Sequence, residues 1–476
     1  MTDLPDHLPP VLIDRFAEIV GDAYALQDQD DIAPYEAERR GLFGGKAALV
    51  LRPGNVEEVS RIMKLATETG TAIVPQSGNT GLVGGQVPDT SGRQVILSLS
   101  RLNRIRELDP LSNTVTVEAG VILENLHAAA DGIDRLFPLS LASQGSCQIG
   151  GNLSSNAGGV GALVYGSARD LCLGVEVVLP TGEVFDDLRK LKKDNTGYDL
   201  KNLFVGAEGT LGVITAAVLK LYPKPKGRES AWIAIETPDV ALDLLHRAGE
   251  AAGSSLTSFE LIGDTPLEFG LRHIPDARNP LEGRWPWYVL LEISSGHSDD
   301  DARQTIEAIL TEAFEAGLVQ DAAISANIAQ AKEFWRLREG FSDAQKPEGA
   351  SIKHDISVPV ASIPEFLRLA AVEVERVCPG ARVCCFGHLG DGNLHYNVSQ
   401  PVGMAPQDYL ALYPTMNKAV FAIVRQLHGS FSAEHGIGSM KRKELVETTS
   451  AVSIDLMRRI KAAFDPAGIM NPGKVL

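Results

Sequence analysis

The sequence predicts an α+β protein built from two regions of different character. The first region, which closes near Pro223, combines short strands with three glycine-rich segments. The second starts at Trp232 and alternates strands with helical segments, which is consistent with helices packed on one antiparallel sheet. A Lys/Pro-rich stretch around Pro223 and Pro225 indicates a linker between them.

Local signals define the elements of the first region. Asn55 and Glu58 fit the N-cap and the third position of a capping box, so a helix is expected from there to Gly70. A turn at Thr181-Gly182 suggests a hairpin. Strands are expected at Ala72–Val74, Val95–Leu99, Thr114–Glu118 and Val175–Leu179.

The second region contains longer elements. Strands are expected at Trp232–Glu236, Tyr288–Ile293 and Ser351–Val358, and helices at Val240–Ala251, Asp300–Ala316 and Ile363–Val377. The tail from Asp465 to Lys474 is too polar and turn-rich to form a core strand.

Composition limits the class of protein. A chain of 476 residues is long enough for two or three domains, and its net charge of −17 argues against a general affinity for nucleic acid or anionic lipid. An anionic substrate would therefore need cations placed locally in its site. No apolar run approaches the roughly 18 residues of a membrane span. Asp3 and Asp6 interrupt any secretory signal, so the cytoplasm is the expected location.

The cysteines indicate packing and not disulfide chemistry. There are five, with no CxxC pair, and an odd number makes a secreted disulfide framework improbable. The adjacent Cys384 and Cys385 are expected to be packing thiols in a strand.

Glycine-rich segments dominate the first region. They run from Pro75 to Gly85 (PQSGNTGLVGG), from Gly145 to Gly166 and from Asp194 to Gly212. In the second, glycine is about three times more frequent than in the whole chain. Closely spaced glycines let the backbone approach a ligand and offer N–H groups to phosphate oxygens. The alternative is that all three are turns of an irregular β-rich domain. Their Asn, Ser and Thr content favours a wall around a large polar cofactor.

The strongest chemical grouping lies late in the chain, in GHLGDGNLHYN (387–397) and SAEHG (432–436). His395 and Asn397 are two residues apart, so on a strand they face the same side. Two imidazoles and a carboxylate form a familiar ligand set for Zn²⁺ or a similar ion. The alternative is that these histidines are ordinary surface or hydrogen-bonded residues.

The three glycine-rich segments, in this order, resemble the FAD-binding domain of the vanillyl-alcohol oxidase superfamily. The resemblance is strongest to its D-2-hydroxyglutarate and D-lactate dehydrogenase branch, and extends to Asn471-Pro472-Gly473-Lys474 at the C-terminus. It implies a two-subdomain FAD-binding domain and a ferredoxin-like substrate domain with an antiparallel sheet. The implied boundaries are an N-terminal helical segment (1–41), the FAD domain (42–223), the substrate and metal domain (224–435) and a C-terminal segment returning to the FAD domain (436–476).

The resemblance also implies the cofactor and its contacts. FAD is expected to be non-covalent, because no histidine lies in the three segments. The implied contacts are Pro75, Gln76, Ser77, Gly78, Asn79, Thr80, Gly81, Ser140, Gly145, Ser146, Gly150, Gly151, Ser154, Asn156, Gly158, Gly159, Gly161, Glu208, Gly209, Gly212, Ile214 and Asn471.

By the same resemblance, His388, His395 and Glu434 hold one divalent metal, Zn most simply and Mn or Fe as alternatives. His435 is implied as the catalytic base, a role that suits an imidazole near neutral pH. His388, Asn397 and His435 also touch substrate, together with Arg338, Ser342 and Lys353. Without the resemblance, Arg338 would be taken for a solvated helix charge. Two cations favour a substrate with a second carboxylate.

The implied activity is oxidation of a D-2-hydroxy acid, with D-2-hydroxyglutarate ahead of D-lactate or D-malate. Electrons would pass to an electron-transfer flavoprotein or a quinone, and the family habit is a homodimer. Alternatives are a metal hydrolase, a non-catalytic flavin-binding partner, an oxidase, and a flavin transferase like alkylglycerone-phosphate synthase.

Overall fold

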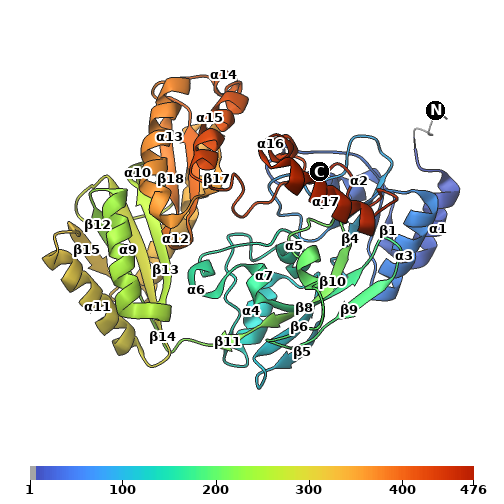
Figure 1. The fold of residues 1–476 in the computed structure, drawn as a ribbon, viewed down its shortest axis with the longest axis horizontal. Coiled ribbons are helices and arrows are strands. Elements are labelled where there is room, and N and C mark those ends of the chain that lie inside the picture. The colour runs from blue at the N-terminus through green and yellow to red at the C-terminus, as the bar shows by residue number, and fades with distance from the viewer. Residues whose placement is uncertain (1–6) are drawn as a thin grey trace. The chain divides into compact units, whose positions relative to one another are not determined.

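The computed structural model describes residues 7–476, which form two compact units (Figure 1). The first unit contains residues 7–159, then Gly166–Pro223 and finally Glu434–Leu476. The second contains Lys224–Ala433 together with the short segment Val160–Tyr165. Among the described residues, no helix is both long and apolar enough to cross a membrane.

The first unit begins with a four-stranded sheet in the order β1-β2-β4-β3. Its strands are β1 (Ala25–Leu26), β2 (Ala47–Leu51), β3 (Ile73–Gln76) and β4 (Gln94–Ser98). Helices α1 (Pro10–Val20), α2 (Gln29–Glu36) and α3 (Val56–Thr69) belong to the same part of the unit. Strands β2, β3 and β4 run parallel, so their carboxyl ends, including the end of β3 at Gln76, share one edge.

The predicted N-cap of α3 at Asn55 is confirmed, but the reciprocal bond of a capping box is displaced by one residue, from the N–H of Asn55 to that of Gly54. Asn55 accepts the N–H of Glu58 at 2.8 Å, while Glu58 reaches back to accept the N–H of Gly54 at 2.7 Å. The helix ends at Gly70 in the left-handed conformation that glycine adopts most easily.

A second sheet in this unit is antiparallel, in the order β5-β6-β10-β8-β9. Its strands are β5 (Ile105–Asp109), β6 (Thr114–Glu118), β8 (Cys172–Val178), β9 (Val184–Asp187) and β10 (Val213–Lys220). The expected hairpin at Thr181-Gly182 joins β8 to β9. The smaller elements are α4 (Leu123–Asp131), β7 (Arg135–Leu136), α5 (Ile149–Ser154), α7 (Ala168–Leu171), α8 (Lys201–Phe204), β11 (Tyr222–Pro223), α16 (Arg442–Thr448) and α17 (Ala451–Phe464).

The C-terminal tail forms no strand, as predicted, but two of its residues enter the core. Ile469 and Met470 are 1% and 0% exposed, and Met470 makes an isolated parallel bridge with Ile73 of β3. Asp465 holds the turn by accepting the N–H groups of both residues. The end of the chain is therefore part of the first unit.

The second unit is built on one antiparallel sheet in the order β15-β12-β14-β13-β18-β19-β16, with β17 also paired to β19. Its strands are β12 (Gly227–Ile235), β13 (Leu256–Gly263), β14 (Trp287–Ser295), β15 (Asp321–Ile324), β16 (Ser351–Ile352), β17 (Asp355–Ser357), β18 (Arg382–His388) and β19 (Asn393–Ser399). Its helices are α6 (Ala162–Tyr165), α9 (Pro238–Ala252), α10 (Asp264–His273), α11 (Asp299–Glu315), α12 (Ile328–Ala344), α13 (Ile363–Val377), α14 (Pro406–Leu410) and α15 (Tyr413–Gln426).

Helices cover both faces of this sheet. One core joins the sheet to α9, α11, α13 and α15, and a second core joins the opposite face to α10 and α12. Strand alternation places Cys385 in the first core and its neighbour Cys384 in the second. Both are buried free thiols, so the expectation of packing cysteines is confirmed. The predicted α+β class is confirmed as well.

One expectation for this part of the chain is wrong. The predicted strand Ser351–Val358 is split into β16 and β17. The buried ring of His354 interrupts it, because its Nδ1 lies 2.8 Å from the carbonyl oxygen of Tyr396, where a backbone partner would otherwise bind. Residues 160–165 fall outside the first unit because Leu163 packs into the core of the second. Gly161, one of the expected flavin contacts, lies in this excursion.

Candidate functional site

The three glycine-rich segments meet at the carboxyl end of β3. A Cβ added to Gly78 would lie 2.2 Å from the carbonyl oxygen of Ser146, so only glycine allows the first segment to touch the second. A Cβ on Gly151 would lie 3.2 Å from the Cβ of Ser77. In the third segment, a Cβ on Gly209 would lie 3.2 Å from Cγ of Pro75. The segments therefore form one cradle, as a cofactor wall requires.

Several expected flavin contacts use their side chains to hold this cradle together. Asn79 donates to the carbonyl oxygen of Ala37 at 2.9 Å, and Asn156 accepts the N–H of Arg169 at 2.9 Å. Both asparagines have positive φ angles, 51° and 50°. Ser154 donates to the carbonyl oxygen of Gly150. What these residues can offer a ligand is mainly their backbone.

Glu208 has a similar role. Its carboxylate accepts the N–H groups of Ile437 and Gly438, each at 2.7 Å, and so holds the loop that follows His435. Burial raises the pKa of this carboxyl group. The hydrogen bonds from the two N–H groups lower it, but the effect of burial is larger. Asn471 donates to the carbonyl oxygens of Gly85 and Glu208, which ties the C-terminus to the first and third glycine segments.

The cradle fits a large polar cofactor. Buried polar atoms normally have hydrogen-bond partners. Among the described residues, Oε1 of Gln148, Nδ2 of Asn152 and Oδ1 of Asn471 are buried without one. These atoms belong to, or tie into, the glycine segments, where a bound ligand could satisfy them.

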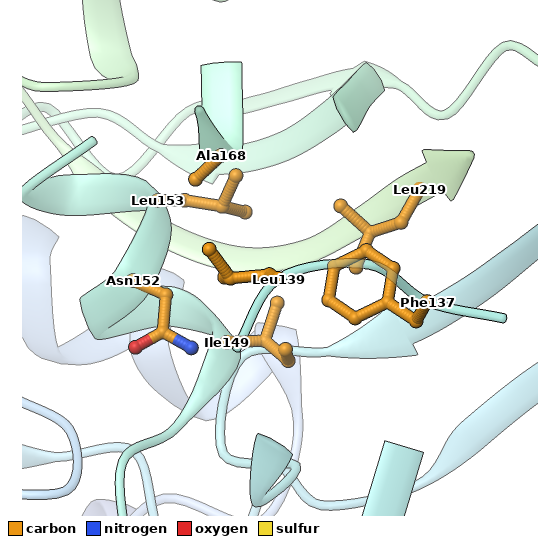
Figure 2. A pocket seen from close by; sticks show the side chains of 7 residues that line it. All are labelled: Phe137, Leu139, Ile149, Asn152, Leu153, Ala168 and Leu219. Atoms are coloured by element: carbon orange, nitrogen blue, oxygen red, sulfur yellow. The ribbon is translucent and has the colours of Figure 1, made fainter. Parts of the chain in front are cut away.

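A small cavity is lined in part by residues of α5, but it is too small to be the cofactor site (Figure 2). It is lined by Phe137, Leu139, Ile149, Asn152, Leu153, Ala168 and Leu219. Its free volume of about 10 Å³ is close to the least that holds one water molecule. It is a packing defect lined by apolar side chains and Asn152.

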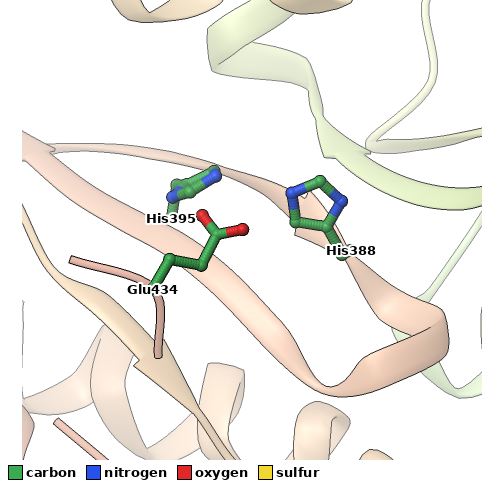
Figure 3. A group of neighbouring side chains, drawn as sticks. All are labelled: His388, His395 and Glu434. Atoms are coloured by element: carbon green, nitrogen blue, oxygen red, sulfur yellow. The ribbon is translucent and has the colours of Figure 1, made fainter. Parts of the chain in front are cut away.

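The predicted metal ligands come together. His388 ends β18 and His395 lies on β19, and the two rings are 5.7 Å apart on the sheet face that also packs α12. Glu434 follows Ala433, whose N–H donates to the carbonyl oxygen of Asp355 in β17, so the backbone brings it to these histidines. One donor atom from each of His388, His395 and Glu434 lies within 4.8 Å of the others. Figure 3 shows the carboxylate pointing at both imidazoles.

A residue that the sequence analysis missed supports this ligand set. Glu260 of β13 is 1% exposed, and its Oε1 lies 2.7 Å from Nδ1 of His388. Its Oε2 accepts Nε of Arg338 at 2.8 Å, and Nη2 of Arg338 lies 2.6 Å away. Burial raises the pKa of Glu260, but Arg338 and His388 outweigh it and hold the value at about 2. Arg338 is thus a buried, paired cation and not a solvated helix charge.

Asp355 was also missed. It is 3% exposed and accepts Nδ2 of Asn393 at 3.0 Å. It forms a second group of close donor atoms with Glu434 and His435, so the expected base lies beside a buried carboxylate. A signal existed in both cases, because Glu260 and Asp355 are acids in otherwise apolar or β-prone runs.

The remaining expected substrate residues surround the same face. Asn397 is buried two residues beyond His395 on β19, on the same side of the strand. Ser342 is exposed one turn after Arg338 on α12. Nζ of Lys353 lies 3.4 Å from the carbonyl oxygen of Ser342. A nitrogen and oxygen ligand set beside cations can bind a divalent metal and an anion together.

Two family models match the chain. The FAD binding domain model matches residues 47–187, and the model of FAD linked oxidases, C-terminal domain, matches residues 224–475. The mitochondrial D-2-hydroxyglutarate dehydrogenase of Arabidopsis thaliana is 38% identical over 464 residues, which cover 98% of this chain and 81% of that protein. The D-2-hydroxyglutarate dehydrogenase of Stutzerimonas stutzeri is 34% identical over 466 residues, 98% and 99% of the two chains.

Solved structures show the same fold at low identity. p-Cresol methylhydroxylase with substrate bound superposes with a TM-score of 0.76 and 18% identity, covering 99% of this chain and 98% of that chain. An alkyldihydroxyacetonephosphate synthase gives a TM-score of 0.74 and 18% identity, covering 99% and 86%.

The fold and the glycine cradle therefore define an FAD-linked oxidoreductase. The chain belongs to the FAD-linked oxidase family and is a homologue of D-2-hydroxyglutarate dehydrogenases.

Proposed function

We propose that the protein is a metal-dependent dehydrogenase that oxidises a D-2-hydroxy acid, D-2-hydroxyglutarate first, to the 2-oxo acid. The observation that carries the proposal is the close grouping of His388, His395 and Glu434 in a chain of this family. The names of its relatives, which match it along nearly its whole length, support the choice of substrate.

Each side chain has a role in this proposal. His388, His395 and Glu434 hold the metal, and its donor set of two nitrogens and a carboxylate oxygen suits Zn²⁺, Mn²⁺ or Fe²⁺. When bound, the metal would make the substrate hydroxyl more acidic, and FAD would supply the acceptor for the hydride that leaves C2. His435 takes the hydroxyl proton, and Asn397 orients the hydroxyl or the adjacent carboxylate.

The far carboxylate of a dicarboxylic substrate needs a cation. Lys353 fits this role, because its ammonium group lies beside the exposed Ser342. Arg338 contributes a fixed guanidinium whose charge is largely balanced by Glu260. D-Lactate lacks the second carboxylate, so Lys353 would not strengthen its binding.

Further parts of the proposal concern the cofactor and partners. FAD binds without a covalent link to histidine. The electron acceptor of the enzyme would be an electron-transfer flavoprotein or a quinone, and the enzyme would work as a homodimer in the cytoplasm.

Anaerobic bleaching of the flavin tests the proposal. The purified yellow protein is mixed with D-2-hydroxyglutarate, D-lactate, D-malate and their L-enantiomers, before and after chelation. We expect rapid bleaching by the D-acids alone, fastest with D-2-hydroxyglutarate, lost on chelation and restored by Zn²⁺ or Mn²⁺. A metal-replete protein that none of these acids bleaches would refute the assignment and favour a transferase without net redox change.

A further inference from the structure

Glu260 occupies an unusual position for a charged residue. It sits in the middle of β13, whose eight residues are all buried, in the centre of the sheet of the second unit. Its register partner on β18 is His388. A buried carboxylate is costly unless charge-bearing partners satisfy it. Its two partners, His388 and Arg338, are residues of the proposed site, so Glu260 is in a position to affect that site.

The two carboxylate oxygens have separate partners. Oε1 lies 2.7 Å from Nδ1 of His388, and Oε2 accepts Nε of Arg338 at 2.8 Å. The guanidinium carbon of Arg338 also lies 4.8 Å from the ring centre of Phe386, the residue two before His388 on β18. A single carboxylate therefore bridges the predicted metal ligand and the predicted anion-binding arginine.

This bridge has a consequence for each partner. A carboxylate on Nδ1 keeps the proton there, so Nε2 is the nitrogen that can coordinate a metal, and it becomes a better donor. The same carboxylate fixes the direction of the guanidinium, which lowers the cost of ordering it around a substrate anion.

We propose that Glu260 is a positioning residue that couples metal binding at His388 to anion binding at Arg338. The inference rests on the proposed function, and it goes further by assigning a role to a residue with no direct place in the reaction. It makes two quantities depend on one carboxylate: the affinity for the metal and the KM for the acid.

The test compares Glu260→Gln with a matched control, Glu348→Gln, in the flavin-loaded protein. Glu348 is also a carboxylate shared by arginines and a histidine, Arg272, Arg382 and His273, and it contacts none of the predicted ligands. The dissociation constant for Zn²⁺ is measured by competition with a chromophoric chelator, and the flavin content and the melting temperature of each variant are recorded.

We expect E260Q to bind Zn²⁺ about tenfold to a hundredfold more weakly than wild type, because loss of a ligand's carboxylate partner has effects of this size. At saturating metal its KM for D-2-hydroxyglutarate should still be raised. E348Q should keep the wild-type metal affinity and KM.

Wild-type metal affinity in E260Q, or an equal loss in E348Q, would overturn the coupling. If E260Q loses its flavin or unfolds, Glu260→Asp, which keeps the charge on a shorter side chain, is measured in the same way. Wild-type metal affinity in E260D, where the shorter acid cannot span both partners, would also overturn it. Failure of the wild-type protein to bind any metal would instead refute the proposed function.

Discussion

The contact between the first two glycine segments makes Gly78 the sharpest test of the flavin cradle. An alanine Cβ at this position would lie 2.2 Å from the carbonyl oxygen of Ser146 and 2.9 Å from Cα of Cys147. Both are backbone atoms, so no side chain can rotate away. The φ angle of Gly78 is not positive. The energetic cost of an alanine here therefore comes from the close contact and not from backbone strain.

The size of the effect follows from the distance. A carbon–oxygen contact relaxes at about 3.3 Å, so the two segments must separate by about 1 Å. Overpacking of this kind costs about 1–3 kcal/mol. If that cost falls on the flavin-binding conformation, Gly78→Ala should weaken FAD binding by about tenfold to a hundredfold.

The assay is the dissociation constant for FAD, measured by flavin fluorescence after deflavination and reconstitution. The control is Gly132→Ala. Gly132 has a helical φ of −61°, and an added Cβ would lie 3.5 Å from the carbonyl oxygens of Ala128 and Ala129, so the FAD affinity of this variant should be unchanged. Equal FAD affinity in G78A and wild type would refute the reasoning that these segments must touch to hold the cofactor.

Three further predictions concern catalysis and stability. His435→Ala should keep FAD and metal bound while lowering kcat by about 10²–10⁴, the usual range for loss of a general base; retention of most turnover would remove His435 from that role. Lys353→Met should raise the KM for D-2-hydroxyglutarate by about tenfold to a hundredfold and leave that for D-lactate unchanged; equal effects on both acids would place Lys353 elsewhere. Burial raises the pKa of Glu348, but His273, Arg382 and Arg272 hold it at about 2, below its ordinary 4.5. The stability that this carboxylate contributes is therefore present above pH 4.5 and is lost as the pH falls towards 2, so the gap in melting temperature between wild type and E348Q should close on acidification; a gap that widens in acid would contradict the assignment.

The sequence predicted well those structural features that depend only on residues close together in the chain. The N-cap of α3 and the hairpin turn at Thr181-Gly182 depend on residues a few positions apart. The split of the expected strand Ser351–Val358 was not predicted, because it depends on the ring of His354 reaching the carbonyl oxygen of Tyr396. That bond spans 42 residues, and strand propensity contains no information about it.

The candidate metal group His388, His395 and Glu434 could be proposed from the sequence because two short glycine-framed stretches carry suitable residue types and resemble a known family. The expected flavin contacts could be proposed as segments of the chain, but the contacts that their side chains make could not be predicted. A glycine-rich segment indicates that its backbone approaches another group closely, but it does not identify that group. Gly78 approaches Ser146 of its own chain, and the carboxylate of Glu208 holds Ile437 and Gly438.

Glu260 shows where inference from residues alone stops. A lone acid in LTSFELIG is a visible anomaly, since an unpaired buried carboxylate is too costly to tolerate and must have a partner. The sequence could thus predict that Glu260 is paired, but its partners lie 78 and 128 residues away. Choosing Arg338 and His388 among the cations and imidazoles of the chain requires the register of β13 with β18 and the packing of α12 on the same face. A buried acid in an apolar strand therefore predicts that a functional network exists, and only the fold identifies which residues it joins.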